Sequence, residues 1–150
     1  MSATVSTRTL VRDAVIRILT GRKKDAQARV PEFAVSPRFL TEQETNQKHT
    51  YCVIVTDEQV DAASSSQRAR GFALTVKLVC YAYDQTDPHA VLDAMIEDAA
   101  EAMGLLVVQP ELRGLVWNVV LGSITTDEGT TAALPWGQAV CQWSASHARA

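Results

Sequence analysis

The chain has 150 residues, of which 47% are hydrophobic and 21% are charged, and its net charge is −3. This length is enough for one compact domain, which at this size buries roughly two thirds of the surface of the unfolded chain. An apolar run of about 18 residues is missing, and so are the apolar stretch and cleavage site of a secretory signal, so we expect a soluble protein that stays inside the cell where it is made.

The charge is divided unevenly along the chain. Residues 1–83 hold 12 Lys and Arg against 8 Asp and Glu, a net charge of +4, whereas residues 84–150 hold 2 against 9, a net charge of −7. A basic half and an acidic half favour head-to-tail packing of identical subunits. Solvated faces without any partner are the alternative interpretation.

The first expected element is a helix at residues 7–20. Ser6 or Thr7 is placed to cap its start and Gly21 to end it. Its apolar side chains fall on one stripe, so the helix is expected to pack by one side. These side chains are Val11, Ala14, Val15, Ile18 and Leu19.

Residues 22–49 show little regular pattern and are expected to form an irregular insert. They begin with the basic cluster Arg22, Lys23 and Lys24. Pro31 and Pro37 flank the segment "EFAVS", which favours either an edge strand or an extended loop there.

A long hairpin is expected over residues 50–83, with a polar arm at residues 57–70. Its strands are "TYCVIVT", which is apolar and β-branched, and "GFALTVKLVCYAYD", which alternates. In the second strand one face is wholly apolar and should meet the helices, while the other is mixed and is available to solvent or a neighbouring subunit. The apolar face comprises Phe72, Leu74, Val76, Leu78, Cys80 and Ala82.

A second helix is expected at residues 87–103, with Asp87 as its cap, Pro88 in its first position and Gly104 at its end. Its apolar stripe faces the sheet and consists of Val91, Leu92, Met95, Ile96, Ala99 and Met103. Its back is acidic and is expected to face solvent, with Asp93, Glu97, Asp98 and Glu101.

A closing hairpin is expected at residues 115–146. If its turn is centred near residue 130, Trp117 lies opposite Trp143, and this aromatic pair strengthens the register. The tail from His147 is expected to be frayed. The elements together predict an α+β, αββαββ two-layer sandwich, with two helices on one face of a mainly antiparallel four-stranded sheet and an extended hairpin arm.

The residues that carry chemistry are scattered. Cys52, Cys80 and Cys141 lie in apolar strand-like sequence without a CxxC pair, which predicts buried reduced thiols. Neither a histidine spacing typical of zinc sites nor a phosphate-binding, dinucleotide-binding or hydrolase motif is present. The sequence therefore predicts no enzyme, no cofactor and no metal site.

The order and polarity of the elements resemble the lambda-type tail terminator proteins of long-tailed bacteriophages. The resemblance covers most of residues 7–146 and rests on the helix "TLVRDAVIRIL", the strand "TYCVIVT", the polar tip, the alternating strand "ALTVKLVCYAYD", the acidic helix "DPHAVLDAMIEDAAEAM" and the segment "GSITTDEG" of the closing hairpin. Residues 22–49 are longer and more basic than in that family's pattern.

The resemblance implies a structural virion protein in the neck region of the tail, made in the host cytoplasm. It implies a hexameric ring that binds the last ring of tail tube protein, stops tube polymerisation and offers a surface to the head–tail connector. DNA then passes through the lumen without specific binding.

Candidate interface residues follow from this expectation. The arm, which is too polar to bury within one subunit, is expected to order against a neighbour or the tube, and a floppy loop is the alternative. Arg68 and Arg70 are expected to meet the acidic back of the second helix. The full set comprises Glu58, Gln59, Ser65, Gln67, Arg68, Arg70, Asp93, Glu97, Asp98, Glu101, Arg22, Lys23 and Lys24.

Two other functions stay open. One is a tail completion or head-to-tail joining protein at the neck, which would bind filled heads rather than tubes. The other is a small α+β ligand-binding domain or enzyme, which would need a well-formed pocket with converging polar groups.

Overall fold

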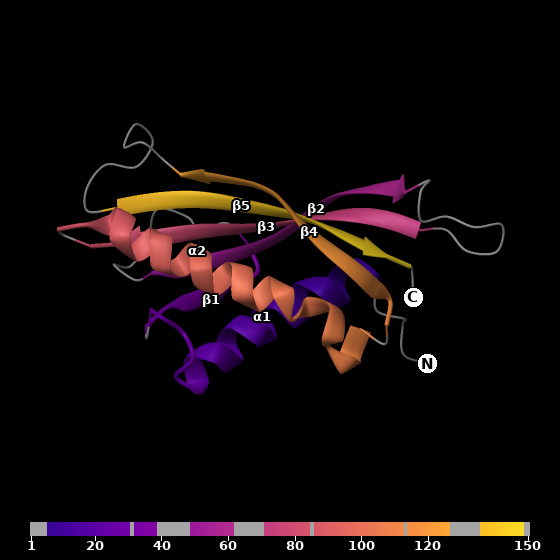
Figure 1. The fold of residues 1–150 in the computed structure, drawn as a ribbon, viewed down its shortest axis with the longest axis horizontal. Coiled ribbons are helices and arrows are strands. Elements are labelled where there is room, and N and C mark those ends of the chain that lie inside the picture. Colours follow the sequence, from indigo (N-terminus) through magenta and orange to yellow (C-terminus); the bar gives the residue numbers. More distant parts are fainter. Residues whose placement is uncertain are drawn as a thin grey trace.

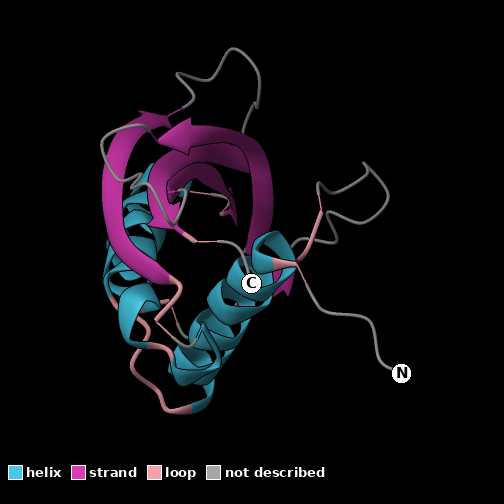
Figure 2. Ribbon diagram, turned by 90° about the vertical axis from the view of Figure 1, so that its right-hand side faces the viewer, coloured by secondary structure: helices cyan, strands magenta, loops and turns pink. Residues whose placement is uncertain are grey.

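Two helices lie on one face of a curved, five-stranded mixed sheet, so the α+β class and the placement of the helices are as expected (Figures 1 and 2). The computed structural model describes residues 6–30, 32–38, 49–61, 71–84, 86–112, 114–126 and 136–148. The elements are α1 (Thr7–Lys24), β1 (Ala34–Ser36), β2 (Thr50–Asp61), β3 (Gly71–Tyr83), α2 (Pro88–Gly104), the 3-10 turns η3 (Leu106–Val108) and η4 (Pro110–Leu112), β4 (Val116–Thr126) and β5 (Trp136–His147). The strand order in the sheet is β1-β2-β3-β5-β4.

Helix α1 begins where the sequence predicts and ends later. The Ser6 hydroxyl accepts a hydrogen bond from the Thr9 backbone N–H at 3.2 Å, and the whole predicted stripe is buried. The predicted end at Gly21 is wrong, because the helix continues to Lys24. The last turn carries three basic side chains, which interact favourably with the negative end of the helix dipole.

Strand β1 changes the predicted sheet from four strands to five and from antiparallel to mixed. It pairs in parallel with β2, with Ala34 opposite Thr50 and Ser36 opposite Cys52. It lies at the edge of the sheet, which is one of the two outcomes that the neighbouring prolines favoured. The predicted αββαββ order was therefore short by one strand.

Strands β2 and β3 form a long antiparallel hairpin. Val53 pairs with Leu78, and a bulge between Thr56 and Glu58 shifts the register before the last pair, Asp61 and Gly71. Residues 57–61, expected within the arm, are therefore strand. Most of the predicted apolar face of β3 is fully buried, and Phe72 is half-buried. Residues 62–70 of the arm lie outside the described residues.

Helix α2 is capped by the Asp87 carboxylate, which accepts from the Ala90 N–H at 3.1 Å, and Pro88 occupies its first turn. Its predicted stripe packs on β3 and β5. Asp98 is only 1% exposed, so its predicted place on the solvent side is wrong.

The closing hairpin has a different register from the one predicted. Trp143 pairs with Leu121 rather than with Trp117, because the pair nearest the turn, Thr126 with Ala139, already centres the hairpin two to three residues beyond residue 130. Trp117 is 42% exposed. His147, expected in a frayed tail, is the last residue of β5 and is fully buried.

One core cluster joins the helices to the sheet. The Phe33 and Tyr51 rings meet edge to face with their centroids 5.1 Å apart, and the Tyr51 hydroxyl donates to the Met95 carbonyl at 2.9 Å. The three cysteines are free and buried, as predicted. Hydrogen bonding to Cys141 and burial raise the pKa of Cys80.

Candidate assembly interface

Four of the charged groups near the candidate interface are paired within the chain. The Asp98 carboxylate accepts from the backbone N–H groups of Arg29 at 2.8 Å and Val30 at 3.3 Å, and from the Arg29 guanidinium at 2.9 Å. Glu101 accepts from Arg22 at 2.5 Å and from Arg29 at 2.6 Å. This cluster, Arg22, Arg29, Asp98 and Glu101, ties the end of α1 and the segment after it to α2.

The pKa directions agree with this pairing. The hydrogen bond from Arg29 lowers the pKa of Glu101, and Arg22 acts in the same direction. Hydrogen bonds to Glu101 and Asp98 raise the pKa of Arg29. Basic groups of the first half thus meet acidic groups of the second half inside one subunit, and only the remaining charges are available to a neighbour.

The remaining candidate charges on the helices are divided between α2 and α1. Asp93 and Glu97 are exposed on α2, and no ion pair among the described residues involves either. Lys23 donates to the Phe33 carbonyl at 2.9 Å, and Lys24 is exposed at the end of α1. The predicted basic cluster at residues 22–24 is therefore divided, because Arg22 turns toward α2 while Lys24 faces outward.

A buried histidine lies against Glu58, near the start of the predicted arm. His147 Nε2 lies 3.1 Å from a Glu58 carboxylate oxygen, and the His147 ring stacks on Phe72 with a centroid distance of 5.7 Å. The other side of Glu58 faces Arg8, with 3.8 Å between the charged atoms. Glu58 therefore points inward rather than toward a partner, and its side chain is only 9% exposed.

The other arm residues divide into exposed and undescribed positions. Gln59 is exposed on β2. Ser65, Gln67, Arg68 and Arg70 lie outside the described residues. The predicted contact of Arg68 and Arg70 with acidic groups stays a prediction.

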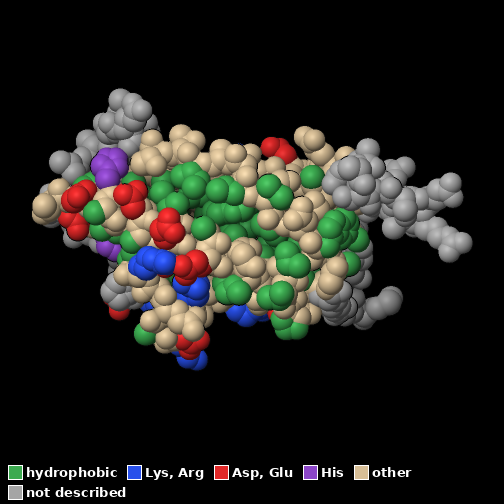
Figure 3. All heavy atoms as spheres, in the orientation of Figure 1, with side chains coloured by type: hydrophobic (Ala, Val, Ile, Leu, Met, Phe, Trp, Pro, Cys, Tyr) green, Lys and Arg blue, Asp and Glu red, His purple; other side chains and the backbone are tan. Residues whose placement is uncertain are grey.

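The residues that the sequence reasoning missed are on β4. Val120, Leu121 and Ile124 are between 43% and 52% exposed, and they lie on the terminal strand of the sheet. Figure 3 shows hydrophobic side chains gathered along the middle of this side of the molecule, where β4 and β5 pass above α2. One signal was present in the sequence. Residues 115–126 contain no charged residue, and their apolar side chains fall on both faces of a strand.

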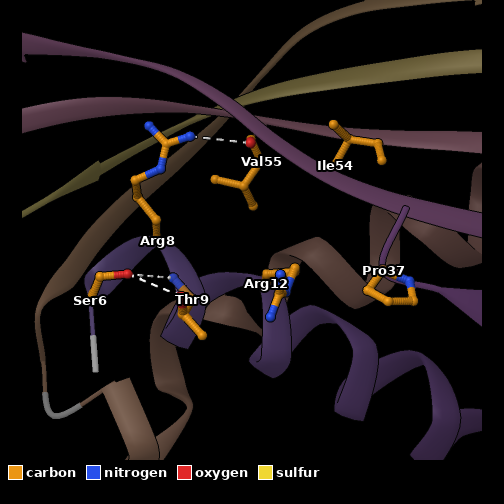
Figure 4. A pocket seen from close by; sticks show the side chains of 7 residues that line it. All are labelled: Ser6, Arg8, Thr9, Arg12, Pro37, Ile54 and Val55. Carbon is orange, nitrogen blue, oxygen red and sulfur yellow. Dashed lines mark hydrogen bonds between the residues drawn. The ribbon is translucent and has the colours of Figure 1, made fainter. Parts of the chain in front are cut away.

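A small open pocket of about 230 Å³ lies between the start of α1 and β2. Figure 4 shows Arg8 reaching from the helix toward Val55 on the strand, and Arg12, Ile54 and Pro37 also line the pocket. The Arg8 guanidinium donates to the Val55 carbonyl at 3.4 Å, which marks that carbonyl as pointing away from β3. The pocket is thus a basic recess beside β2.

Across the ranges that the structure describes, no helix is long and apolar enough to cross a membrane. The same ranges hold no group of three or more His, Cys, Asp or Glu side chains placed to hold a metal ion. No protein-family model matches the chain, and no curated protein is significantly similar to it in sequence.

Proposed function

We propose that this chain is a structural protein of a bacteriophage tail, a tail terminator that forms a ring at the head-proximal end of the tail tube. The ring ends tube polymerisation and serves as the docking surface for the head–tail connector. The number of subunits, six, comes from the resemblance in element order. No catalytic step is part of this proposal.

The observation that carries the proposal is the exposed apolar edge of the sheet at β4. An edge strand presents unpaired N–H and C=O groups, and proteins that act alone usually shield such edges with charge, proline or a covering segment. Over residues 115–126 this strand has neither charge nor proline, and Trp117, Val120, Leu121 and Ile124 are exposed on it. Such a surface is typical of a subunit that is completed by a partner.

The long β2–β3 hairpin supports the same function. Its paired part runs to Asp61 and Gly71, at the end of the molecule where α1 begins and β5 ends (Figure 1). Glu58 on β2 and Phe72 on β3 both lie against the buried His147 where the hairpin leaves the core. A projecting hairpin suits contact with an adjacent ring of subunits.

Electron microscopy tests the proposal directly. The purified protein is imaged alone and after mixing with purified tail tubes and with filled heads. We expect rings in the first sample and rings seated at one end of each tube in the second. Binding to filled heads without binding to tubes would instead assign the protein to head-to-tail joining. A particle with no affinity for either tubes or heads would refute both roles.

A further inference from the structure

Strand β4 has an apolar face on the side of the sheet that carries the helices. Leu121 pairs with Trp143 and Ile124 pairs with Cys141, and directly paired residues project from the same face of a sheet. Trp143 and Cys141 are buried in the core on β5, against which α2 packs. Leu121 and Ile124 therefore belong to the helix-bearing face. The opposite face of β4 is mainly polar and comprises Asn118, Val120, Ser123 and Thr125.

This apolar face is covered only at the start of the strand. Val116 is 1% exposed, whereas Leu121 is 46% exposed and Ile124 is 43% exposed. Helix α1 packs on β2 and β1, and α2 packs on β3 and β5, while the main contacts of β4 are with β5 and η3. Among the described residues, the helix layer therefore ends one strand before the edge of the sheet.

The uncovered part of β4 has the dimensions of one more helix. Packed helices lie about 8–10 Å apart and strands about 4.8 Å apart, so one helix covers about two strands. A third helix at this spacing would lie over β4, beside α2. The strand from Val119 to Ile124 extends over about 17 Å, which corresponds to about 11 residues of helix.

The flank of α2 that borders this face is acidic. Asp98 meets Arg29 on the side of α2 toward α1, so Ile96, two residues away and hence on the opposite flank, lies on the side toward β4. Asp93 lies one turn before Ile96 on the same flank, and Glu97 follows Asp93 by one turn. Both carboxylates are exposed, no ion pair among the described residues involves them, and α2 contains no Lys or Arg.

The surface seen in Figure 3 combines these two features. Hydrophobic side chains gather along the middle of the molecule, and acidic side chains lie beside them over α2. Strand β4 itself contributes no charge, because residues 115–126 contain none. A partner that covers this surface therefore meets apolar side chains in the middle and carboxylates along one side.

We propose that the helix-bearing face of β4 docks an amphipathic helix of another protein. The apolar stripe of this helix packs on Leu121 and Ile124, and its Lys or Arg side chains lie beside Asp93 and Glu97. The apolar contact supplies most of the affinity, and the charges set the orientation. Neither described helix of a second copy can fill this role, because α1 already buries its apolar stripe in its own core and α2 is acidic.

The docking face differs from the surface left for contacts between copies. Val120 pairs with Ser144 and projects from the opposite face of β4, and it is 52% exposed. This side chain and the backbone edge of β4 stay accessible when a helix covers Leu121 and Ile124. The inference therefore goes beyond the proposed function and does not depend on ring formation.

Three synthetic peptides of about 18 residues, long enough to form helix in water, test the docking. The first has a leucine stripe flanked by lysines, the second has the same stripe flanked by glutamates, and the third has the composition of the first in an order without a stripe. Fluorescence anisotropy measures their dissociation constants. We expect the first peptide to bind at least about tenfold more tightly than either of the others, a difference of about 1.4 kcal/mol. Amide shifts in NMR spectra should change on β4 and α2 and stay unchanged on β2.

Two adjacent substitutions separate the two faces of β4. Leu121→Ser removes an apolar contact and should weaken binding of the lysine peptide by about tenfold or more. Val120→Ser changes the other face and should leave the affinity within about twofold. Both side chains are about half exposed, so both variants should fold, which thermal unfolding verifies.

A further variant isolates the charge argument. Asp93→Asn combined with Glu97→Gln should make the lysine and glutamate peptides bind alike, because the apolar face is unchanged. A double variant that still prefers the lysine peptide as strongly as the wild type would contradict the role of these two carboxylates.

Other results would overturn the proposal. They are a wild-type protein that does not bind the lysine peptide, equal binding of the glutamate peptide, or equal losses in Leu121→Ser and Val120→Ser. Sedimentation velocity tests the remaining occupant. Wild-type assemblies that become monomeric in Leu121→Ser but not in Val120→Ser would show that a second copy covers this face, and would overturn the proposal as well.

This inference and the proposed function fail separately. Rings that cap tail tubes while the lysine peptide does not bind would refute the docking of a helix and leave the function intact. A protein that binds the lysine peptide through Leu121 but has no affinity for tubes or heads would refute the function and leave the docking face intact.

Discussion

Replacing Asp98 by alanine tests the charged cluster that ties α1 and the following segment to α2. Asp98 is 1% exposed and accepts backbone hydrogen bonds from Arg29 and Val30 at 2.8 and 3.3 Å. A hydrogen bond to a charged group contributes about 1.5 kcal/mol or more, and a buried donor that loses its acceptor carries a desolvation penalty. The loss of these two bonds is expected to lower the free energy of unfolding by about 3 kcal/mol.

The Arg29 guanidinium adds little to this figure. The Arg29 side chain is 45% exposed, so water solvates it once the carboxylate is removed, and the loss of this ion pair costs little. A loss of about 3 kcal/mol corresponds to a melting temperature lowered by about 6 to 12 °C for a domain of this size. Urea unfolding followed by circular dichroism measures the free energy, and thermal unfolding measures the melting temperature.

Two further variants make the result specific. Glu97→Ala changes the preceding, exposed carboxylate of the same helix and should stay within about 0.5 kcal/mol of the wild type. Asp98→Asn keeps an oxygen acceptor for the backbone N–H groups and should cost less than Asp98→Ala. A loss below about 1 kcal/mol in Asp98→Ala would refute the reasoning, because water would then satisfy the same donors.

Two other predictions concern packing and pH. A methyl group at Gly137 would lie 2.9 Å from Leu92 Cδ1, so Gly137→Ala should lower stability by about 1 to 3 kcal/mol in urea unfolding, whereas Gly104→Ala, with open space around its Cβ, should not. An unchanged Gly137→Ala would show that Leu92 moves aside freely. Burial lowers the pKa of His49 below its ordinary 6.5, and its neutral Nδ1 accepts the Tyr83 N–H at 3.1 Å. The stability that this adds is present above about pH 6.5 and is lost as the pH falls through the lowered pKa, so His49→Gln should reduce the fall in unfolding free energy between pH 7.5 and 5. An equally steep fall in the variant would place the titrating group elsewhere.

The sequence predicted those elements whose burial follows a local period. The stripe of α1 and the apolar face of β3 are buried as expected, because a side chain spaced at 3.6 or 2 residues meets the same neighbouring layer each time. The caps Ser6 and Asp87 were also predicted, since capping depends on residues only a few positions apart.

The predictions that were wrong concern contacts between segments that are distant in the sequence. The parallel pairing of β1 with β2 joins residues on either side of a long connection, and no local pattern specifies it. The register of β4 against β5 is set at the end nearest the turn, where Thr126 pairs with Ala139, and this pairing keeps Trp117 away from Trp143.

Asp98 shows how such a site could have been recognised. It lies between Met95 and Ala102 on the buried side of α2, spaced at three and four residues from them. A carboxylate in an apolar stripe needs a partner when buried. The basic residues from Arg22 to Arg29 offered one, but only the fold brings Arg29 to the helix.

Internal and external charges therefore have different roles in this molecule. The cluster around Asp98 is part of the folded subunit, so its charges are already paired within the chain. Exposed groups such as Glu97 and Lys24 act through water, where 0.15 M salt screens them within about 8 Å. In the ring that we propose, they orient copies during association, and the exposed apolar side chains of β4 supply the stability of the contact. Raising the salt concentration should accordingly slow assembly more than it dissociates finished assemblies, as stopped-flow light scattering and sedimentation measure. Finished assemblies that dissociate in salt as readily as they fail to form would show that charge, rather than the β4 edge, holds the copies together.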